Sequence, residues 1–181
     1  MVLTLATLIP LGMSQSATYH VPVDFETIQA AIDSATHGDE IVVATGTYRE
    51  NIHFRGKNIV VRSNNPKNTT IVANTIIFAN RLKPVVTFEG TENTKASLSG
   101  FTITNGYNLS GGGAAGVLAN NAKARISHNV IRNNRGGGIN RCDGTITFNL
   151  IKDNIGAGSG ISYSDSLCIG NIIVRNLGGI V

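Results

Sequence analysis

Three segments share one pattern: Ile126-Ser127-His128-Asn129-Val130-Ile131, Ile146-Thr147-Phe148-Asn149-Leu150-Ile151 and Cys168-Ile169-Gly170-Asn171-Ile172-Ile173. Their asparagines are 20 and then 22 residues apart. A glycine-led strand is expected before each one: Gly116-Val117-Leu118, Gly138-Ile139-Asn140 and Gly160-Ile161-Ser162. A period near twenty with β-branched residues at alternate positions predicts one turn of a solenoid per repeat.

Stacking such coils about 4.8 Å apart as parallel sheets brings equivalent residues into columns. Two inward columns are expected, one of Ile126, Ile146 and Cys168 and one of Ile131, Ile151 and Ile173. A third column, the structural ladder Asn129, Asn149 and Asn171, is expected at a sharp turn, where each amide can bond its neighbour or the backbone. Leu98 to Asn105 is a looser copy with Phe101 at the asparagine position. The leading glycines are expected to supply positive φ at another corner.

The first half of the chain is less regular. Residues 24–35 read as an amphipathic helix with Asp24 as its N-cap and an apolar stripe of Ile28, Ala31, Ile32 and Ala35. Strands are expected at 40–44, 58–62, 70–73 and 84–88. A helix placed before the first coil would cover the open end of the core, as solenoids require.

These patterns predict an all-β fold, a single-stranded right-handed parallel β-helix of roughly six coils with an N-terminal capping α-helix. Residues 1–17 read as a signal peptide: a short apolar stretch is followed by small residues suited to cleavage. We therefore expect a secreted or cell-surface protein with a β-helix domain at 18–181. The chain closes on Gly178-Gly179-Ile180-Val181, which repeats the start of a glycine-led strand. We expect the domain to be truncated there, with further coils or an end-on protein partner beyond.

Composition narrows the class of partner. Only 14% of the 181 residues are charged and 6% are aromatic, and the net charge is +4. The basic residues of the second half are dispersed, whereas a nucleic-acid surface needs clustered cations and stacking aromatics. We therefore predict no nucleic-acid partner. No stretch is long enough to cross a membrane, so no membrane partner is predicted either.

The stretch from Tyr19 onward resembles the right-handed parallel β-helix proteins of the pectin lyase-like superfamily, of the carbohydrate-binding and sugar-hydrolase type. The resemblance is most specific at Asp24 to Ile32 and at Gly38 to Ile52. That opening is also similar to pectin methylesterases, whose early Gly-x-Tyr-x-Glu motif is matched by Gly46, Tyr48 and Glu50. The resemblance implies the fold and a carbohydrate ligand.

The catalytic signatures of that superfamily are missing from the sequence. Pectin methylesterases carry a Gln-Asp pair and a Gly-Arg-Pro-Trp-like segment, and neither occurs here. The calcium-binding aspartates and arginine pattern of pectate lyases and the Asn-Thr-Asp, Asp-Asp and Gly-His-Gly signatures of polygalacturonases do not occur either. The resemblance therefore implies the fold without a known chemistry, and we lean toward no enzymatic activity for this chain alone.

One set of residues nevertheless suits a sugar. Asp143 and Asp165 each stand five residues after a leading glycine, with Asn121 at the same count in the coil before. Two carboxylates about 5 Å apart suit acid–base or nucleophilic attack on a glycosidic bond, so they are the candidate catalytic residues. Arg141 and Tyr163 could hold a uronate carboxylate and a sugar ring, with Asn140 as a third substrate-binding residue. The alternative is that Asp-Gly and Asp-Ser simply form turns.

The cysteines and histidines indicate no further site. Cys168 replaces a core isoleucine and Cys142 follows a strand, so we expect no disulfide between them and a buried thiol at Cys168. The scattered histidines and acidic residues give no metal-binding cluster, so we predict no metal site and no cofactor, and the sequence leaves calcium open.

Three functions remain open from the sequence. The chain is a polysaccharide-binding module, a polysaccharide lyase or glycoside hydrolase with divergent catalytic coils, or a structural adhesin stalk without a ligand.

Overall fold

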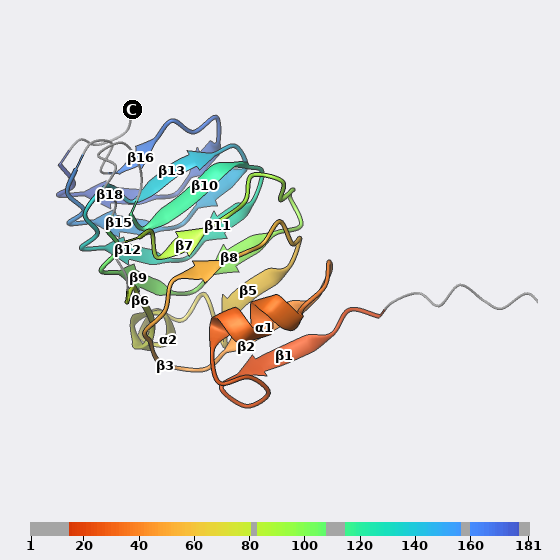
Figure 1. The fold of residues 1–181 in the computed structure, drawn as a ribbon. Coiled ribbons are helices and arrows are strands. Elements are labelled where there is room, and N and C mark those ends of the chain that lie inside the picture. The colour runs from red at the N-terminus through yellow and green to blue at the C-terminus, as the bar shows by residue number, and fades with distance from the viewer. Residues whose placement is uncertain (1–14, 81–82, 108–114, 157–159, 178–181) are drawn as a thin grey trace, which may run out of the picture.

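The computed structural model describes residues 15–80, 83–107, 115–156 and 160–177. All of the predicted signal peptide except residues 15–17, and the closing segment 178–181, lie outside these ranges. Figure 1 shows the described chain as strands stacked in layers, with a helix beside the first of them. Every strand pairing in the described ranges is parallel, and the strands form three sheets.

Each sheet takes one strand from each successive turn of the chain. The seven-stranded sheet has the order β1 (Thr18–Val21), β2 (Glu40–Val43), β5 (Val60–Ser63), β8 (Ser97–Ser99), β11 (Arg125–Ser127), β14 (Thr145–Thr147), β17 (Leu167–Ile169). The six-stranded sheet has the order β3 (Gly46–Tyr48), β6 (Thr75–Phe78), β9 (Thr102–Thr104), β12 (Val130–Arg132), β15 (Leu150–Lys152), β18 (Ile172–Val174). The five-stranded sheet has the order β4 (Ile52–His53), β7 (Val86–Thr87), β10 (Val117–Ala122), β13 (Ile139–Cys142), β16 (Ile161–Ser162). This topology is compatible with a parallel β-solenoid.

The predicted columns are confirmed by the register. Ile126 pairs with Ile146 and Ile146 with Cys168. Ile131 pairs with Ile151 and Ile151 with Ile173, while Leu98 and Ile103 precede them in the same columns. Apolar residues at these positions form one continuous core, which also contains the stacked rings of Phe54 and Phe88, 4.1 Å apart.

The N-terminal helix exists, but it is shorter than predicted. Helix α1 spans Ile28–Ser34, and its N-cap is Thr27, whose Oγ1 accepts from the backbone N–H of Ala30 at 3.1 Å. Asp24 was predicted as the cap, but its carboxylate instead accepts from His20 N at 2.6 Å, so it closes the preceding turn. The predicted stripe is buried, and α1 packs on β1, β2 and β4.

One predicted strand is wrong. Residues 70–73 belong to helix α2 (Thr69–Asn74), although they are rich in the β-branched residues that favour strands. Asn68 decides the local structure, because its Oδ1 accepts from the backbone N–H groups of Thr70 and Ile71 and so caps a helix. The other three expected strands are present with shifted ends, as β2, β5 and β7.

The leading glycines were also misread. Gly116 and Gly138 do not have positive φ, which occurs instead at Gly136 and Gly137 among others. Gly116 is needed for space, because a Cβ there would lie 2.5 Å from the carbonyl oxygen of Gly138 in the next coil. At the asparagine corner the left-handed conformation falls on Gly100, His128, Phe148 and Gly170.

The core assignment gives a direct test. Ile151 is fully buried between Ile131 and Ile173, so Ile151→Ala should lower the free energy of unfolding by roughly 2–5 kcal/mol in urea denaturation. Leu150→Ala, at the adjacent outward and half-buried position, is the matched control and should cost clearly less. Equal losses from the two variants would contradict the inward assignment of Ile151.

Asp39 gives a pH-dependent test of how the first strand is held. Burial alone would raise the pKa of Asp39, but hydrogen bonds from Thr36 N, Ala17 N and Thr36 Oγ1 outweigh it and hold the pKa below its usual value. Because the folded pKa is the lower one, ionised Asp39 stabilises the fold above its unfolded pKa of about 3.9. That stabilisation is lost as the pH falls through the folded value.

Asp39→Asn should therefore be less stable than the parent at pH 7, with a difference that narrows in urea titrations near pH 3. Asp165→Asn, at an exposed position, is the control for removing one carboxylate. A stability gap for Asp39→Asn that is unchanged between the two pH values would refute this role of the ionised carboxylate.

Candidate functional site

The two predicted carboxylates lie in successive coils, but the carboxylate of Asp143 forms hydrogen bonds to neighbouring turns. Asp143 follows β13 and Asp165 follows β16 in the next coil. Asp143 Oδ1 accepts from the backbone N–H of Asp165 at 3.4 Å, and its Oδ2 accepts from Asn121 Nδ2 at 3.1 Å. Both oxygens of Asp143 thus hold neighbouring turns together, while Asp165 is exposed. These hydrogen bonds are those of a turn.

The count that aligned Asn121 with Asp143 is wrong. Leu118 pairs with Asn140 and Ala122 with Cys142, so residues 119–121 lie opposite the single residue Arg141. Asn120 and Asn121 both have positive φ, at 50° and 70°, and form an irregularity in β10. The side chain of Asn121 nevertheless donates to Asp143. The two residues are therefore in contact although they do not occupy equivalent positions in the strand register.

The three predicted substrate-binding residues are placed differently from one another. Arg141 and Tyr163 are equivalent residues of successive coils, and both project from left-handed turn positions with φ of 55° and 50°. Arg141 is exposed, and Tyr163 is 64% exposed. Asn140 is only 1% exposed, and its Nδ2 donates to Ser162 Oγ at 2.9 Å. Asn140 therefore stabilises the sheet and does not reach the surface.

The asparagine ladder is present as predicted. Asn149 Oδ1 accepts from the backbone N–H and the Nδ2 of Asn129, at 3.0 and 3.1 Å, and Asn171 Oδ1 does the same for Asn149. Each Nδ2 also donates to a strand carbonyl of the preceding coil, as Asn149 does to Ile126 O at 2.9 Å. At the top of the column, Asn129 Oδ1 accepts from Phe101 N at 3.0 Å.

A second ladder was missed by the sequence reading. Asn134, Asn154 and Asn176 repeat the same bonds at the next corner, and Asn134 Oδ1 accepts from Gly106 N at 2.8 Å. The sequence contains a pattern that predicts this second ladder, because these asparagines stand five residues after those of the first ladder in all three repeats. Two corners of the described coils are therefore fixed by stacked carboxamides.

A groove runs beside this second ladder and is named here the corner groove. It has a volume of about 550 Å³ and is lined by Ala79, Asn80, Asn105, Gly106, Tyr107, Asn133, Arg135, Asp153 and Ile155. Tyr107, Arg135 and Ile155 pair as single residues of successive coils, and Arg135 N donates to Gly106 O at 2.9 Å. Asn105 and Asn133 form a parallel column with positive φ. Asp153 continues this column in the next coil, beside Ile155. The groove thus presents an amide and a larger side chain in two successive coils, and a carboxylate with Ile155 in the third.

The acidic side chain of the corner groove is paired with an arginine, whereas its basic side chain is exposed. Arg175 binds both carboxylate oxygens of Asp153, at 2.7 and 2.9 Å, and this guanidinium holds the pKa of Asp153 below its usual value. Arg135 is exposed. The negative charge of the groove is therefore paired, whereas a guanidinium faces solvent beside the amides.

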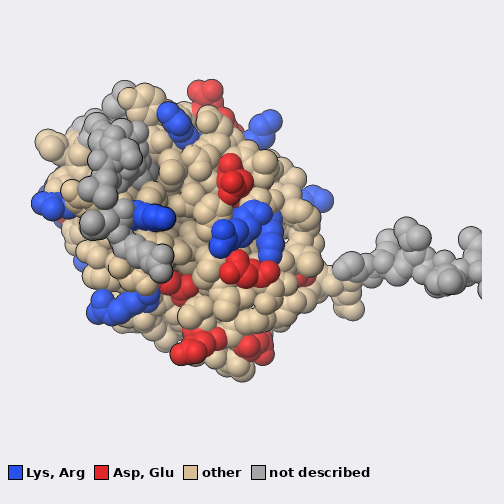
Figure 2. Space-filling view, in the orientation of Figure 1, with Lys and Arg blue, Asp and Glu red and all other residues tan. Residues whose placement is uncertain are grey.

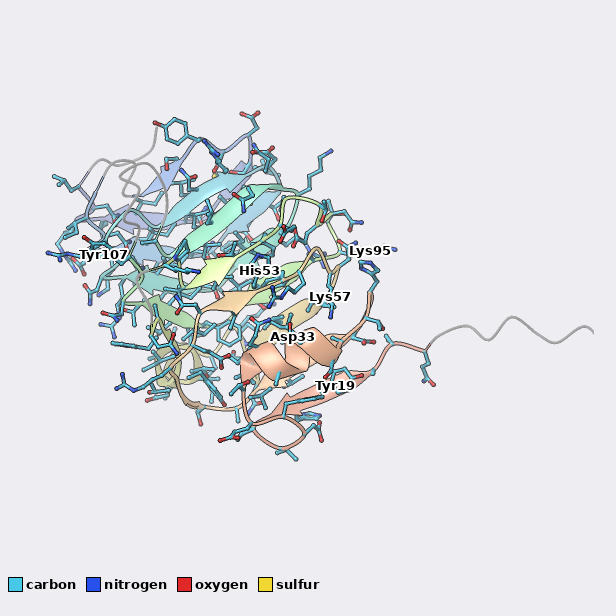
Figure 3. The ribbon with its side chains drawn as sticks, in the orientation of Figure 1. Tyr19, Asp33, His53, Lys57, Lys95 and Tyr107 are labelled. Carbon is cyan, nitrogen blue, oxygen red and sulfur yellow. The ribbon has the colours of Figure 1, made fainter. Side chains whose placement is uncertain are left out.

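A second hollow of about 490 Å³, named the helix-side groove, meets the corner groove at Asn80, which lines both. Its wall includes His53, Lys83 and Thr87. Figure 3 shows His53 near helix α1 and Tyr107 farther from it, toward the left edge of the molecule. Both ring nitrogens of His53 are engaged, Nδ1 by the backbone N–H of Arg55 and Nε2 by Glu89 Oε2, each at 3.0 Å.

The early Gly-x-Tyr-x-Glu motif fixes the N-terminal helix. The two carboxylate oxygens of Glu50 accept from the backbone N–H groups of Ile28 and Gln29 at the start of α1, at 3.0 and 2.8 Å. Burial raises the pKa of Glu50, and these two hydrogen bonds oppose the rise. The Tyr48 hydroxyl donates to Ala44 O at 3.0 Å. In this chain the motif joins the first coil to its cap.

The cysteines are unpaired, as predicted, but their environments are exchanged. Cys142 ends β13 and is buried, and burial raises the pKa of its thiol to about 11. Cys168 occupies the predicted core column, yet it is exposed, which corrects the expected buried thiol. It lies in β17, which is the final strand of the seven-stranded sheet in the described part of the chain.

Other features of the described ranges bear on partners. Figure 2 shows positive and negative side chains interspersed on the visible face. Within residues 15–80, 83–107, 115–156 and 160–177, no group of three or more His, Cys, Asp or Glu side chains is arranged to hold a metal ion. In the same ranges no helix has the length and apolar character needed to cross a membrane.

Comparison with known proteins gives no relative: no protein-family model, no curated protein and no solved structure matches this chain. Evidence for function therefore comes from the geometry of the chain itself.

The ladder gives a prediction for the fold that carries the groove. Asn149→Ala would remove the acceptor of the buried Asn129 backbone N–H and Nδ2 and the donor to Ile126 O and Asn171 Oδ1, at about 1–3 kcal/mol for each lost buried bond. We expect Asn149→Ala to lower the free energy of unfolding by at least about 3 kcal/mol, measured by urea denaturation.

Asn133→Ala is the matched control, because that asparagine is exposed in the neighbouring turn. A neutral Asn149→Ala would mean that the ladder contributes nothing to stability.

Proposed function

We propose that this protein is a right-handed parallel β-helix of the pectin lyase-like type, with roughly six coils, that binds an acidic polysaccharide outside the cell. The single observation that supports the proposal is the corner groove, in which carboxamides, a tyrosine and an arginine from successive coils face one open channel. The coil spacing of about 4.8 Å is comparable to the length of one sugar residue, so neighbouring coils can contact neighbouring sugars.

The side chains of the groove suit an acidic sugar polymer. Carboxamides such as Asn133 both donate to and accept from hydroxyl groups. Arg135 presents a planar fork that matches a carboxylate, and Tyr107 offers a ring face with a polar tip. Because Asp153 is paired with Arg175, it opposes a bound carboxylate less than a free aspartate would.

Binding is preferred to catalysis as the proposed function. Both oxygens of Asp143 already accept turn hydrogen bonds, and Asn140 is buried against Ser162. The alternative binding site is the exposed pair Arg141 and Tyr163. These residues lie at the C-terminal ends of β13 and β16, away from the corner groove. The export that the proposal requires rests on the signal peptide predicted from the sequence.

The test is a calorimetric titration with polygalacturonate, using its fully methyl-esterified form as the uncharged comparison. Binding should be specific to the acidic polymer and should weaken with added salt. Arg135→Ala should weaken it roughly tenfold or more, since a charge-assisted hydrogen bond is lost, and Tyr107→Ala should weaken it as well.

Arg141→Ala and Tyr163→Ala are the matched controls, since they remove the same two residue types from the turn site. Loss of binding only in these two variants would move the site to that turn. Release of sugar products that Asp143→Asn abolishes would replace the binding module by the enzyme. Absence of both binding and turnover with intact thermal unfolding would leave the structural stalk.

A further inference from the structure

The corner groove and the helix-side groove form one path along the stack of coils, because Asn80 lines both of them. Backbone contacts connect the coils along this path. The backbone N–H of Tyr107 donates to Lys83 O at 3.1 Å, and Tyr107 pairs with Arg135 in the following coil. Lys83, Tyr107 and Arg135 therefore belong to three successive coils.

Two exposed cations lie along this path, Lys83 in the wall of the helix-side groove and Arg135 in the wall of the corner groove. Within the described part of the chain, neither of them forms an ion pair. The carboxylates in the same walls are engaged, Glu50 by the start of helix α1 and Asp153 by Arg175. The path therefore offers two cations to an anionic ligand.

The two cations are separated by one coil without a charge in the groove. The groove residues of that coil are Asn105, Gly106 and the half-buried Tyr107. Because coils stack about 4.8 Å apart, Lys83 and Arg135 are about 10 Å apart along the stack. One sugar residue has about the length of one coil, so this separation corresponds to every second sugar of a polymer that follows the path.

We propose that the acidic polysaccharide is recognised at alternate sugars. Lys83 and Arg135 bind the carboxylates of the first and third sugars of a trisaccharide, through the charge-assisted hydrogen bonds that an ammonium and a guanidinium both donate. Tyr107 contacts the sugar between them, whose own charge meets no cation. The helix-side groove thus becomes the second half of the binding site, an assignment that rests on the proposed function, and Lys83 determines specificity. Polymers in which acidic and neutral sugars alternate satisfy this pattern.

The experiment is a calorimetric titration of the full chain with trigalacturonate and with its three mono-methyl esters, each of which is neutral at one sugar. The central ester should bind within about twofold of trigalacturonate, whereas each terminal ester should bind roughly three- to tenfold more weakly. Lys83→Ala should weaken trigalacturonate binding by the same factor and remove the effect of one terminal ester. Arg135→Ala should remove the effect of the other.

Lys95→Ala is the matched control, because it removes an exposed lysine that lines neither groove. Figure 3 shows Lys95 at the right edge of the molecule and Tyr107 toward the left edge. This variant should bind trigalacturonate like the parent. Thermal unfolding of the three variants checks that the changes are in binding and not in folding.

The outcomes separate this site from the proposed function. Unchanged binding by Lys83→Ala, with weakened binding by Arg135→Ala, would overturn the alternate-sugar site and leave the polysaccharide-binding module in place. Equal losses from all three esters would also overturn it, as would binding of polygalacturonate without binding of trigalacturonate. Absence of binding to either ligand by the parent would overturn the proposed function as well.

Discussion

The fold depends on the vertical bonding of one coil to the next, and the two asparagine ladders are its most demanding part. A parallel sheet satisfies its backbone groups along the strands, but at each corner the chain turns away and leaves N–H and C=O groups without partners. Asn129, Asn149 and Asn171 supply both a donor and an acceptor at that point, and the first two are buried. Because the same residue type recurs in register, one solution serves three successive coils.

The grooves follow from this constraint. A corner held by Asn134 and Asn154 leaves the residues on either side, such as Asn133 and Arg135, in fixed positions facing outward. Their spacing is then that of the coils, and a repeating ligand meets a repeating surface. Rigid backbone at the corner keeps the loss of conformational freedom on binding small for these side chains.

The repeat was readable from the sequence because its inward residues and its corner asparagines are each required by strong local physics. Ile126, Ile146 and Ile151 alternate with polar residues, and the period follows directly. Helix α2 was not readable, because its β-branched residues favour a strand and a single cap at Asn68 overrides them. The candidate site was read only in part: Asp143 and Arg141 lie where expected, but two extra residues in β10 shift the count for Asn121. The corner groove depends on residues distant in sequence, such as Asn80 and Asp153, which no local pattern joins.

The irregularity in β10 has a consequence for how such a chain can diversify. Asn120 and Asn121 are accommodated between Leu118 and Ala122 by two residues of left-handed backbone, and the flanking residues stay in register with Asn140 and Cys142. Insertions at this edge are thus absorbed within a single coil and are not passed on to its neighbours. Each coil can lengthen its own turn independently, so the surface can acquire new shapes while the core beneath keeps one repeating design.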